Sequence, residues 1–338
     1  MAYKGYGIDL GTKNIKIYKE KQGIVIDQKN TIAVNDIGKV LAIGDGAYEM
    51  YEKTPETITV TFPVKYGVIA EFSSMQELLH NFLCEQLKGG SGNKDVFIAV
   101  PTNITDVEKR AFAELVENSK LKAKHVYMVE KPIADAVGAG LDIKSPKGVM
   151  LVDIGADTTE VTIMSLGGIV VSKLLQIGGN QLDEDIVQAI KREANVIIGM
   201  KSAEQCKREL SSALPDKAEE MTTKGRYLVT GLPATITVSS ELVYNAVAED
   251  LRIIMEAIKV ILERTPPEIS SDIIDHGVYV TGGGSKIEGL GTLIEQETHL
   301  KANLFDKPEA SVIMGLGRII EEQDLRDLAF SELRPSYV

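Results

Sequence analysis

The sequence has few of the residues that build metal centres or disulfide frameworks. Among its 338 residues there are two cysteines and four histidines. Cys84 and Cys206 fall in helical patterns without metal-ligand spacing, and the histidines are scattered along the chain. We therefore expect reduced thiols in the core and no metal site made from cysteine and histidine.

Positive charge and long apolar runs are also scarce. The chain has 37 Lys and Arg residues against 49 Asp and Glu residues, which gives a net charge of −12. This balance repels nucleic acid, and we see no basic patch that would reverse it locally. No apolar run approaches the length of a membrane span, and the first residues do not read as a signal peptide. We expect a cytoplasmic protein without a nucleic acid partner.

Short β-rich runs alternate with longer helical patterns, which is typical of α/β layers. Two capping boxes, Ser74 with Glu77 and Thr105 with Glu108, predict where two helices begin. A further helix is expected at 182–198. Strands are expected at residues 5–10, 15–18, 24–27, 96–100, 125–129, 149–153, 160–164, 169–175 and 277–281.

The two halves of the chain begin alike. GIDLGTKN at residues 7–14 and LVDIGADT at 151–158 both read as an apolar strand that ends in Asp-x-Gly before a polar turn. One such turn is common, but two that each open a strand hairpin indicate a duplication at domain scale. The backbone amides of such turns bind phosphate oxygens, and the aspartate can hold a hydrated Mg²⁺. Two facing copies would grip one nucleotide.

A third glycine cluster, Gly282 to Gly284, follows a predicted strand and precedes a helix expected near Ile287. A strand, a tight loop and a helix N-terminus in this order suit an anion or a base ring. Taken alone, a turn of this kind is a weak indication of a binding site.

Seven motifs in sequence order make the chain resemble the actin, Hsp70 and sugar-kinase superfamily, and most closely the MreB family. The resemblance covers about residues 5–320, and a chance match to all motifs is negligible. The motifs are GIDLGT at 7–12, TPETITVTFPVKYGVIAEF at 54–72, AVPTNITDVEKRA at 99–111, GADTTEVTIMSLGGIVVSK at 155–173, IGGNQLDEDI at 177–186, SAEQCKREL at 202–210 and VYVTGGGSKIEGL at 278–290.

The resemblance implies an actin-like ATPase fold of the α/β class, with duplicated mixed-sheet domains, helices on both sheet faces and a central nucleotide cleft. It implies ATP or ADP with Mg²⁺ as cofactors. It also implies four subdomains, which are IA at 1–30, 76–144 and 321–338, IB at 31–75, IIA at 145–180 and 244–320, and IIB at 181–243.

The same resemblance assigns site residues by position. Asp9 and Asp153 would hold Mg²⁺ through water. Glu204 and Lys207 lie three apart on one helix face and would contact ribose and adenine, although a solvated intrahelical ion pair is the alternative interpretation. The implied nucleotide-binding residues are Asp9, Gly11, Thr12, Lys13, Asn14, Asp153, Gly155, Asp157, Thr158, Thr159, Gly178, Gly179, Asn180, Glu204, Lys207, Gly282, Gly283, Gly284 and Lys286.

The position before Pro132 departs from relatives that hydrolyse ATP. Those relatives carry there a carboxylate that orders the attacking water, and this chain has Lys131. The change removes a general-base contribution of about 10²–10⁴-fold. Glu130 would point elsewhere on a strand end and is interpreted as a poor substitute. The expected catalytic positions are therefore Lys131, in degenerate form, and Thr158.

The second phosphate loop departs as well, because Asp157 stands where relatives have glycine. A carboxylate beside a γ-phosphate is repulsive, so we expect weak or absent ATP hydrolysis. Lys131 could pair with Asp157 and offset this charge, with exposure of both side chains to solvent as the alternative. Asn180 stands where aspartate is common; it keeps the hydrogen-bonding shape but drops a charge.

The resemblance implies self-assembly into a homopolymer of paired protofilaments by head-to-tail stacking, with other MreB paralogues as further partners, in the service of cell shape or motility. The loop at 88–95 is polar, so direct membrane insertion is doubtful, although Lys88 and Lys94 could touch anionic lipid weakly. Three alternatives stay open: an active ATPase filament protein, a small-molecule kinase of the same superfamily, and an Hsp70-like or plasmid-segregation ATPase.

Overall fold

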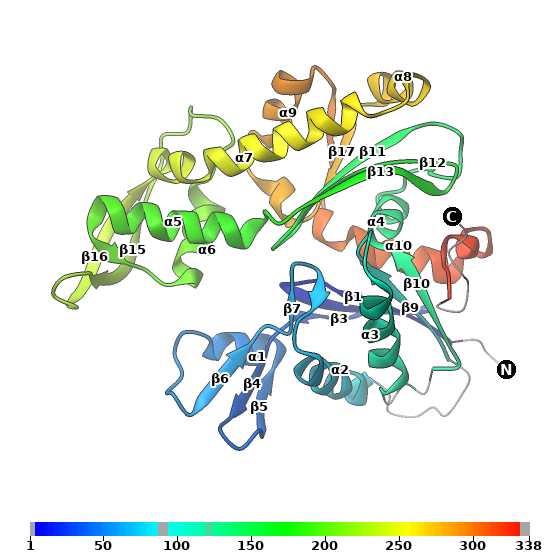
Figure 1. Cartoon of the computed structure of the whole chain (residues 1–338). Coiled ribbons are helices and arrows are strands. Elements are labelled where there is room, and N and C mark those ends of the chain that lie inside the picture. The colour runs from blue at the N-terminus through cyan, green and yellow to red at the C-terminus, as the bar shows by residue number, and fades with distance from the viewer. Residues whose placement is uncertain (1–3, 87–93, 120, 122, 332–338) are drawn as a thin grey trace. The chain divides into compact units, whose positions relative to one another are not determined.

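The structure is a computed structural model that describes residues 4–86, 94–119, 121 and 123–331 (Figure 1). The chain forms two compact units. Unit 1 comprises Met1–Pro146, Ser165–Ile169 and Glu309–Val338, and unit 2 comprises Lys147–Met164 and Val170–Pro308. The division of each half into two predicted subdomains stays a prediction.

Unit 1 is built on a five-stranded sheet. Its strands are β1 (Lys4–Leu10), β2 (Asn14–Lys19), β3 (Gly23–Lys29), β9 (Lys94–Val100) and β10 (His125–Glu130). Their order across the sheet is β10-β9-β1-β2-β3. Strand β9 lies parallel to β1 and β10, whereas β2 lies antiparallel to β1 and β3, so the sheet is mixed.

Helices cover both faces of this sheet. They are α2 (Phe72–Gln86), α3 (Asp106–Glu117), α4 (Lys131–Gly138) and α10 (Ser311–Glu321). Tyr6 and Ile8 of β1 belong to one core together with residues of α2 and α3. Gly7 between them points to the opposite face, where an added Cβ would lie 3.0 Å from the Cβ of Leu316 in α10. This alternation along β1 is what lets helices pack on two sides.

Smaller elements complete unit 1. A three-stranded sheet has the order β5-β4-β6, and β7 pairs with β8. These elements are β4 (Ile32–Asn35), β5 (Val40–Ile43), α1 (Gly44–Met50), β6 (Ile58–Thr61), β7 (Val64–Lys65), β8 (Val68–Ile69) and the 3₁₀ helix η3 (Gln323–Leu328).

Unit 2 repeats the same sheet topology. Its strands are β11 (Val149–Ile154), β12 (Thr159–Ser165), β13 (Gly168–Leu175), β17 (Val278–Thr281) and β18 (Ala302–Leu304). The order is β13-β12-β11-β17-β18, with β11 antiparallel to β12 and parallel to β17. Strand β11 therefore occupies the place that β1 has in unit 1. This confirms the predicted mixed-sheet duplication.

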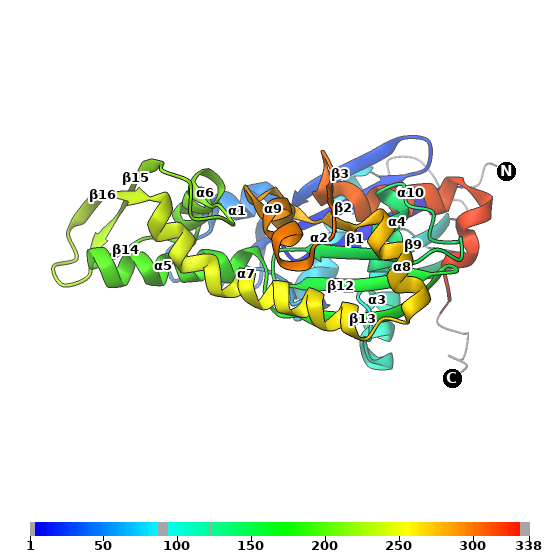
Figure 2. The same ribbon diagram turned by 90° about the horizontal axis from the view of Figure 1, so that it is seen from above.

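The helices of unit 2 pack around this sheet and extend beyond it. They are α5 (Gly179–Ala194), α6 (Met200–Leu210), α7 (Ser240–Glu263), α8 (Pro267–His276), α9 (Leu290–Thr298) and the 3₁₀ turn η1 (Gly283–Lys286), with η2 (Pro308–Ala310) at the boundary of the units. One core joins β11 with α5, α6 and α7. Helices α5 and α7 lie side by side (Figures 1 and 2), and α8 packs on β11 through Gly148 and Ile269.

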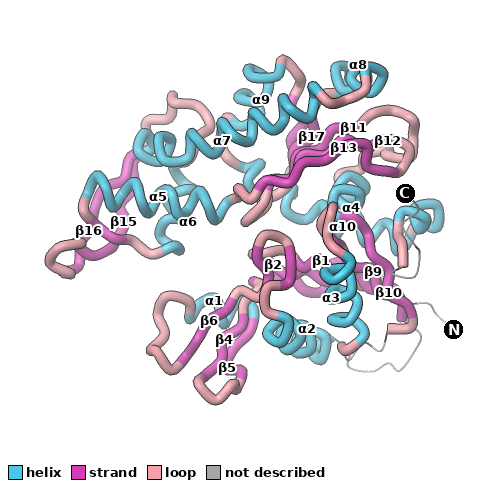
Figure 3. The backbone as a smooth tube through the Cα atoms, viewed as in Figure 1, coloured by secondary structure: helices cyan, strands magenta, loops and turns pink. Residues whose placement is uncertain are grey.

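A second, three-stranded sheet of unit 2 has the order β14-β15-β16. Its strands are β14 (Val196–Ile197), β15 (Glu220–Tyr227) and β16 (Pro233–Ser239). Strands β15 and β16 form a hairpin, which Figure 3 shows at the end of α5 that is remote from β11.

Several helix boundaries differ from the predictions. The Thr105 capping box is confirmed, because Thr105 N donates to Glu108 Oε2 at 2.7 Å and Glu108 N donates to Thr105 Oγ1 at 3.2 Å. The Ser74 box is wrong, because α2 begins two residues earlier at Phe72 and Ser74 Oγ donates to Glu71 at 3.1 Å. A capping box read from spacing alone does not tell which serine is in helical conformation.

Two predicted helices of unit 2 need correction. The helix expected at 182–198 runs from Gly179 to Ala194, because Asn195 adopts the left-handed region with φ 51° and ends it. The helix expected near Ile287 begins at Leu290, since the glycine cluster itself winds into η1 and Gly289, with φ 72°, separates the two. In each case a residue in the left-handed region marks one helix end, which is the C-terminus of α5 at Asn195 and the N-terminus of α9 at Gly289.

The structure also bears on the predictions for the cysteines and for the two lysines suggested to contact lipid. Cys206 is a buried free thiol in α6, whereas Lys88 and the side chain of Cys84 lie outside the described residues. Lys94 is buried in β9 with its ammonium 5.9 Å from the Tyr6 ring centroid, so the suggested lipid contact of Lys94 is wrong. In the described part of the chain no helix is long and apolar enough to cross a membrane.

Candidate functional site

The turn after β1 is held in one conformation by its neighbours. A Cβ at Gly11 would lie 2.7 Å from the carbonyl oxygen of Asn14, so a larger residue does not fit the turn. The buried Asn30 closes it from outside: its Nδ2 donates to Gly11 O at 2.9 Å, and its backbone N donates to Lys13 O at 3.0 Å. The sequence motifs did not single out Asn30, because it lies 16 residues beyond the turn.

Side chains of this turn differ in what they can offer a ligand. Asp9 is buried at the end of β1, directly opposite Lys16 on β2. Asn14 uses its side chain within the sheet, donating to Asp27 Oδ1 at 3.0 Å and accepting from Lys29 Nζ at 3.3 Å. A ligand would therefore meet the backbone of Asn14. Two other predicted residues, Thr12 and Lys13, are half-buried in the turn itself.

The turn after β11 is the equivalent in unit 2. Gly155 N donates to Thr158 O at 2.8 Å and closes it, while Thr159 Oγ1 donates to Ile177 O at 2.8 Å, which gives that threonine a structural role. Asp153 is buried at the end of β11, directly opposite the buried Glu160. Two carboxylates at such positions repel each other, so this end of the sheet favours a positive charge, from a side chain or an ion.

The residues present fit a Mg²⁺ that is shared with a phosphate ligand. Among the described residues no group of three or more His, Cys, Asp or Glu side chains could hold a metal ion by itself. Mg²⁺ commonly binds through one or two carboxylates together with water and substrate phosphates. Asp153 and Asp9 each supply such a carboxylate within their own unit.

The first turn of α5 packs directly on the 155–158 turn. A Cβ at Gly178 would lie 2.7 Å from the backbone of Ala156, so the two segments touch. Gly179 N donates to Gly155 O at 3.0 Å and Asn180 N donates to Ala156 O at 2.7 Å. The two motifs, separated by about twenty residues in sequence, are thereby brought together.

Helix α6 contributes a charged residue to the same place. Lys207 Nζ lies 2.7 Å from Asp183 Oδ1 and also donates to the carbonyl oxygen of Gly179. Glu204 Oε1 accepts from Arg208 at 2.6 Å. The side chains of Glu204 and Lys207 are each only 13% exposed, so the alternative of a solvated surface pair is wrong. Asp183, which the motifs did not single out, is the buried partner of Lys207.

The glycine cluster after β17 reaches the end of β11, because Thr281 is the register partner of Asp153. A Cβ at Gly282, whose φ is 76°, would overlap Asp153 Oδ1, and one at Gly284 would overlap the side chain of Ile154. A Cβ at Gly283 would meet no described atom within 4 Å. Packing thus explains two of the glycines and leaves open space at the third. Lys286, at the end of η1, is exposed.

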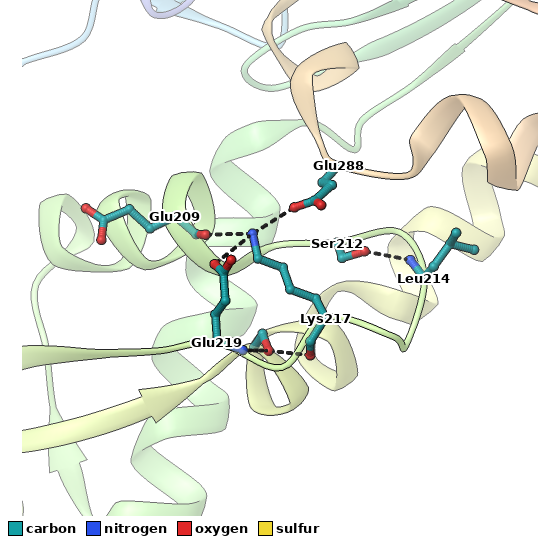
Figure 4. A network of polar contacts seen from close by, with 7 residues as sticks. Glu209, Ser212, Leu214, Lys217, Glu219 and Glu288 are labelled. Atoms are coloured by element: carbon teal, nitrogen blue, oxygen red, sulfur yellow. Dashed lines mark hydrogen bonds and ion pairs between the residues drawn. The ribbon is translucent and has the colours of Figure 1, made fainter.

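Lys217 ties α6 to the segment after the glycine cluster (Figure 4). Its Nζ donates to Glu209 O at 2.8 Å and to Glu288 Oε2 at 2.8 Å, and lies 3.3 Å from Glu219 Oε2. Burial lowers the pKa of Lys217, but its hydrogen bonds with Glu288 and Glu219 outweigh this effect, and the pKa lies above its usual value. Lys217 therefore joins the end of α6 to Glu288, which follows the glycine cluster in the chain.

The position that the resemblance assigns to the catalytic carboxylate lies at the end of β10. Glu130 is the last residue of that strand, and Lys131 is the first residue of α4. Burial raises the pKa of Glu130, and the charge of Lys109 partly offsets the rise. A cation in the first turn of a helix opposes the helix dipole, so Lys131 is an unfavourable residue there. Its suggested pairing with Asp157 joins residues of different units and stays a prediction.

Comparison with known proteins identifies what the chain is similar to. A family model described as MreB/Mbl protein matches residues 3–327. Over 327 residues the chain is 40% identical to the cell shape-determining protein Mbl of Bacillus subtilis (strain 168), covering 96% of this chain and 98% of that protein. It is 37% identical to the cell shape-determining protein MreB of Escherichia coli (strain K12), covering 94% and 93%. The crystal structure of MreB5 of Spiroplasma citri bound to ADP matches with a TM-score of 0.91 at 31% identity, covering 97% and 98%, and the AMPPNP-bound structure gives the same values.

Proposed function

This chain belongs to the MreB/Mbl family, and from this premise we propose that it is a nucleotide-binding cytoskeletal subunit that polymerises into filaments. The family match confirms the resemblance read from the motifs, and the actin-like α/β fold is confirmed with it. The proposal is carried by one observation within unit 2. The 155–158 turn, the first turn of α5 and the glycine cluster after β17 all meet at the end of β11.

The ligand we propose is ATP or ADP with Mg²⁺. MreB5, similar to this chain over nearly its full length, was crystallised with ADP and with AMPPNP. In this chain the amides of the 155–158 turn would bind phosphate oxygens, and Asp153 would orient the water ligands of Mg²⁺. The open side of Gly283 leaves room for a flat ring, and Lys286 ends the same 3₁₀ turn. Bound Mg²⁺ would neutralise phosphate charge.

We further propose that hydrolysis is weak or absent. An ammonium at Lys131 does not accept a proton from water unless its pKa is strongly lowered. A negative charge at Asp157 disfavours an incoming phosphate. The competing possibility is an active ATPase that uses Glu130, and one observation favours it: burial raises the pKa of this carboxyl, as is common for general bases.

One experiment tests both parts of this proposal. Purified protein is incubated with Mg-ATP, and phosphate release is measured in the same tubes in which polymer is sedimented. We expect sedimentable polymer with little phosphate. Brisk phosphate release that Glu130→Gln abolishes would establish the active-ATPase alternative. Absence of polymer over a range of concentration and salt would refute the filament proposal.

The cellular role we propose follows from the relatives, both called cell shape-determining proteins. Filaments of this chain would act in the cytoplasm in cell shape or in motility driven by cell shape, alone or with MreB paralogues. Co-sedimentation with a paralogue and flotation with vesicles of anionic lipid test the two kinds of contact. Flotation is expected to be weak, because the chain has a net charge of −12.

A further inference from the structure

The side chain of Asn180 makes a hydrogen bond that the motifs did not predict. Its Nδ2 donates to Asp157 Oδ1 at 2.7 Å, within the short range typical of hydrogen bonds to charged groups. Asn180 lies in the first turn of α5, and Asp157 is in the middle of the 155–158 turn. Both side chains are half-buried, so water competes only partly for this bond.

The bond closes a short ring between two segments that already touch. The backbone N of Asn180 donates to Ala156 O at 2.7 Å, next to the residue that the side chain binds. The amide and the backbone of one residue therefore hold two successive residues of the turn. Lys207 Nζ donates to the carbonyl oxygen of Gly179, the residue before Asn180, and is also paired with Asp183. Lys207 thus holds the first turn of α5, and Asn180 of that turn holds residues 156 and 157.

The chemistry of the pair depends on the amide. A carboxylate can only accept hydrogen bonds, so the Asp157 oxygen needs a donor opposite it. An aspartate at position 180 would set two carboxylates within hydrogen-bonding distance, and one of them would have to take up a proton or turn away. Turning away would release the side chain of Asp157 from α5.

We propose that Asn180 is a positioning residue, whose side-chain amide holds the Asp157 carboxylate against α5 and thereby keeps the 155–158 turn in the conformation that binds phosphate. This inference rests on the proposed nucleotide binding and specifies a determinant of it. It explains how the turn accommodates a carboxylate: one oxygen of Asp157 is committed to Asn180.

The test compares four proteins by their affinity for Mg-ADP and by their melting temperature without nucleotide, at pH 8 and pH 5.5. They are wild type, Asn180→Asp, the exchange Asp157→Asn with Asn180→Asp, and the control Gln205→Glu. In the control, an amide that donates to Glu209 at 2.9 Å becomes a carboxylate on the exposed face of α6. The chemical change is the same as in Asn180→Asp, but the site lies away from the turn.

We expect Asn180→Asp to bind Mg-ADP roughly tenfold more weakly than wild type at pH 8, because a charged hydrogen bond is lost. Its deficit relative to wild type should shrink at pH 5.5, where a close pair of carboxylates shares a proton. The exchange variant restores a donor and an acceptor, so its affinity should return to within about twofold of wild type. Gln205→Glu should match wild type at both pH values.

The proposal is overturned if Asn180→Asp behaves like Gln205→Glu, or if the exchange variant is no better than Asn180→Asp. The melting temperatures separate this outcome from a failure of the proposed function. If wild type does not bind Mg-ADP, the function is refuted, but the pair still predicts a lower melting temperature for Asn180→Asp at pH 8 and recovery in the exchange variant. Equal melting temperatures of wild type, Asn180→Asp and the exchange variant would then also refute the proposed role of the Asn180–Asp157 hydrogen bond.

Discussion

Lys207 Nζ lies 2.7 Å from Asp183 Oδ1, and the two side chains are only 13% and 3% exposed. The lysine is on α6 and the aspartate is on α5, so the pair fastens two helices next to the 155–158 turn. Charges taken so far out of water are costly unless they are paired. The folded state therefore requires α5 and α6 to keep these two side chains in contact.

Removal of one partner should be strongly destabilising. We expect Lys207→Met to lower the free energy of unfolding by about 3–5 kcal/mol, because Asp183 is left buried without its cation. Urea denaturation at pH 7 measures this. The matched control is Lys259→Met on α7, whose ammonium pairs with Glu297 while the two side chains are 43% and 44% exposed; its loss should be at most about 1 kcal/mol. Equal losses in the two variants would contradict the buried-pair interpretation.

Asp250 should make stability depend on pH near neutrality. Burial, the hydrogen bond with Asp185 and the charges of Asp185 and Glu249 raise the pKa of Asp250 to about 7. A raised folded-state pKa means that the folded state binds the proton more tightly. Its stabilising effect is fully present below the unfolded pKa, near pH 4, and is lost as pH rises through 7.

Replacement of Asp250 tests this directly. Asp250→Asn keeps the shape, cannot ionise and can donate to Asp185, so it should be more stable than wild type by about 1–2 kcal/mol at pH 8 after allowance for solvent screening. At pH 4 the difference should nearly vanish. Denaturation curves between pH 4 and 8 give the comparison, with the exposed Glu256→Gln on the same helix as control. A constant difference across this range would rule out Asp250 as the titrating group.

Two neighbouring glycines should respond differently to the same substitution. Gly282→Ala would force a Cβ onto Asp153 at a positive φ, and we expect a loss of about 2 kcal/mol or more in stability. Gly283→Ala meets open space among the described residues, so the melting temperature should stay within about 2 °C of wild type. Its affinity for Mg-ADP should nevertheless fall. If Gly283→Ala binds nucleotide normally, the open space at Gly283 is not part of the binding site.

Restoration of the degenerate positions should increase hydrolysis. At a saturating concentration of ATP, Lys131→Glu together with Asp157→Gly should raise phosphate release at least tenfold above wild type, because a general base contributes about 10²-fold or more. Saturation is needed because Asp157→Gly also removes the acceptor of the Asn180 hydrogen bond and should weaken nucleotide binding. Lys131→Glu alone should also stabilise α4 by about 0.3–1 kcal/mol, because an anion suits a helix N-terminus. Lys124 is exposed and directly precedes β10, so Lys124→Glu makes the same change in net charge as Lys131→Glu and serves as its control. Unchanged phosphate release in the double variant would count against this interpretation of the defect.

Local features of the chain were predictable because they depend on a few consecutive residues. The Asp-x-Gly turns and the hairpins that follow them come from strand periodicity and from glycines that near neighbours require, as Gly11 shows against Asn14. The Thr105 capping box is local in the same sense. The Ser74 box failed because serine and glutamate at this spacing also occur inside a helix.

The candidate site was predictable only in part. The motifs identified the segments that meet at the end of β11, but not the partners of their side chains. Glu204 and Lys207 look like a surface pair in sequence, and their burial follows from the packing of α6 on α5. Asp183 and Asn30 escaped notice because their roles depend on residues at least 16 positions away.

The sequence by itself determined the α/β class, the duplication, the family and the positions of the glycine-rich turns, because each of these is written in short-range patterns. The tertiary structure decided which charges are paired. The bonds of Asn180 with Asp157 and of Lys207 with Asp183 exist only because folding of unit 2 brings α5, α6 and the turn after β11 into contact, and burial there makes an unpaired charge costly.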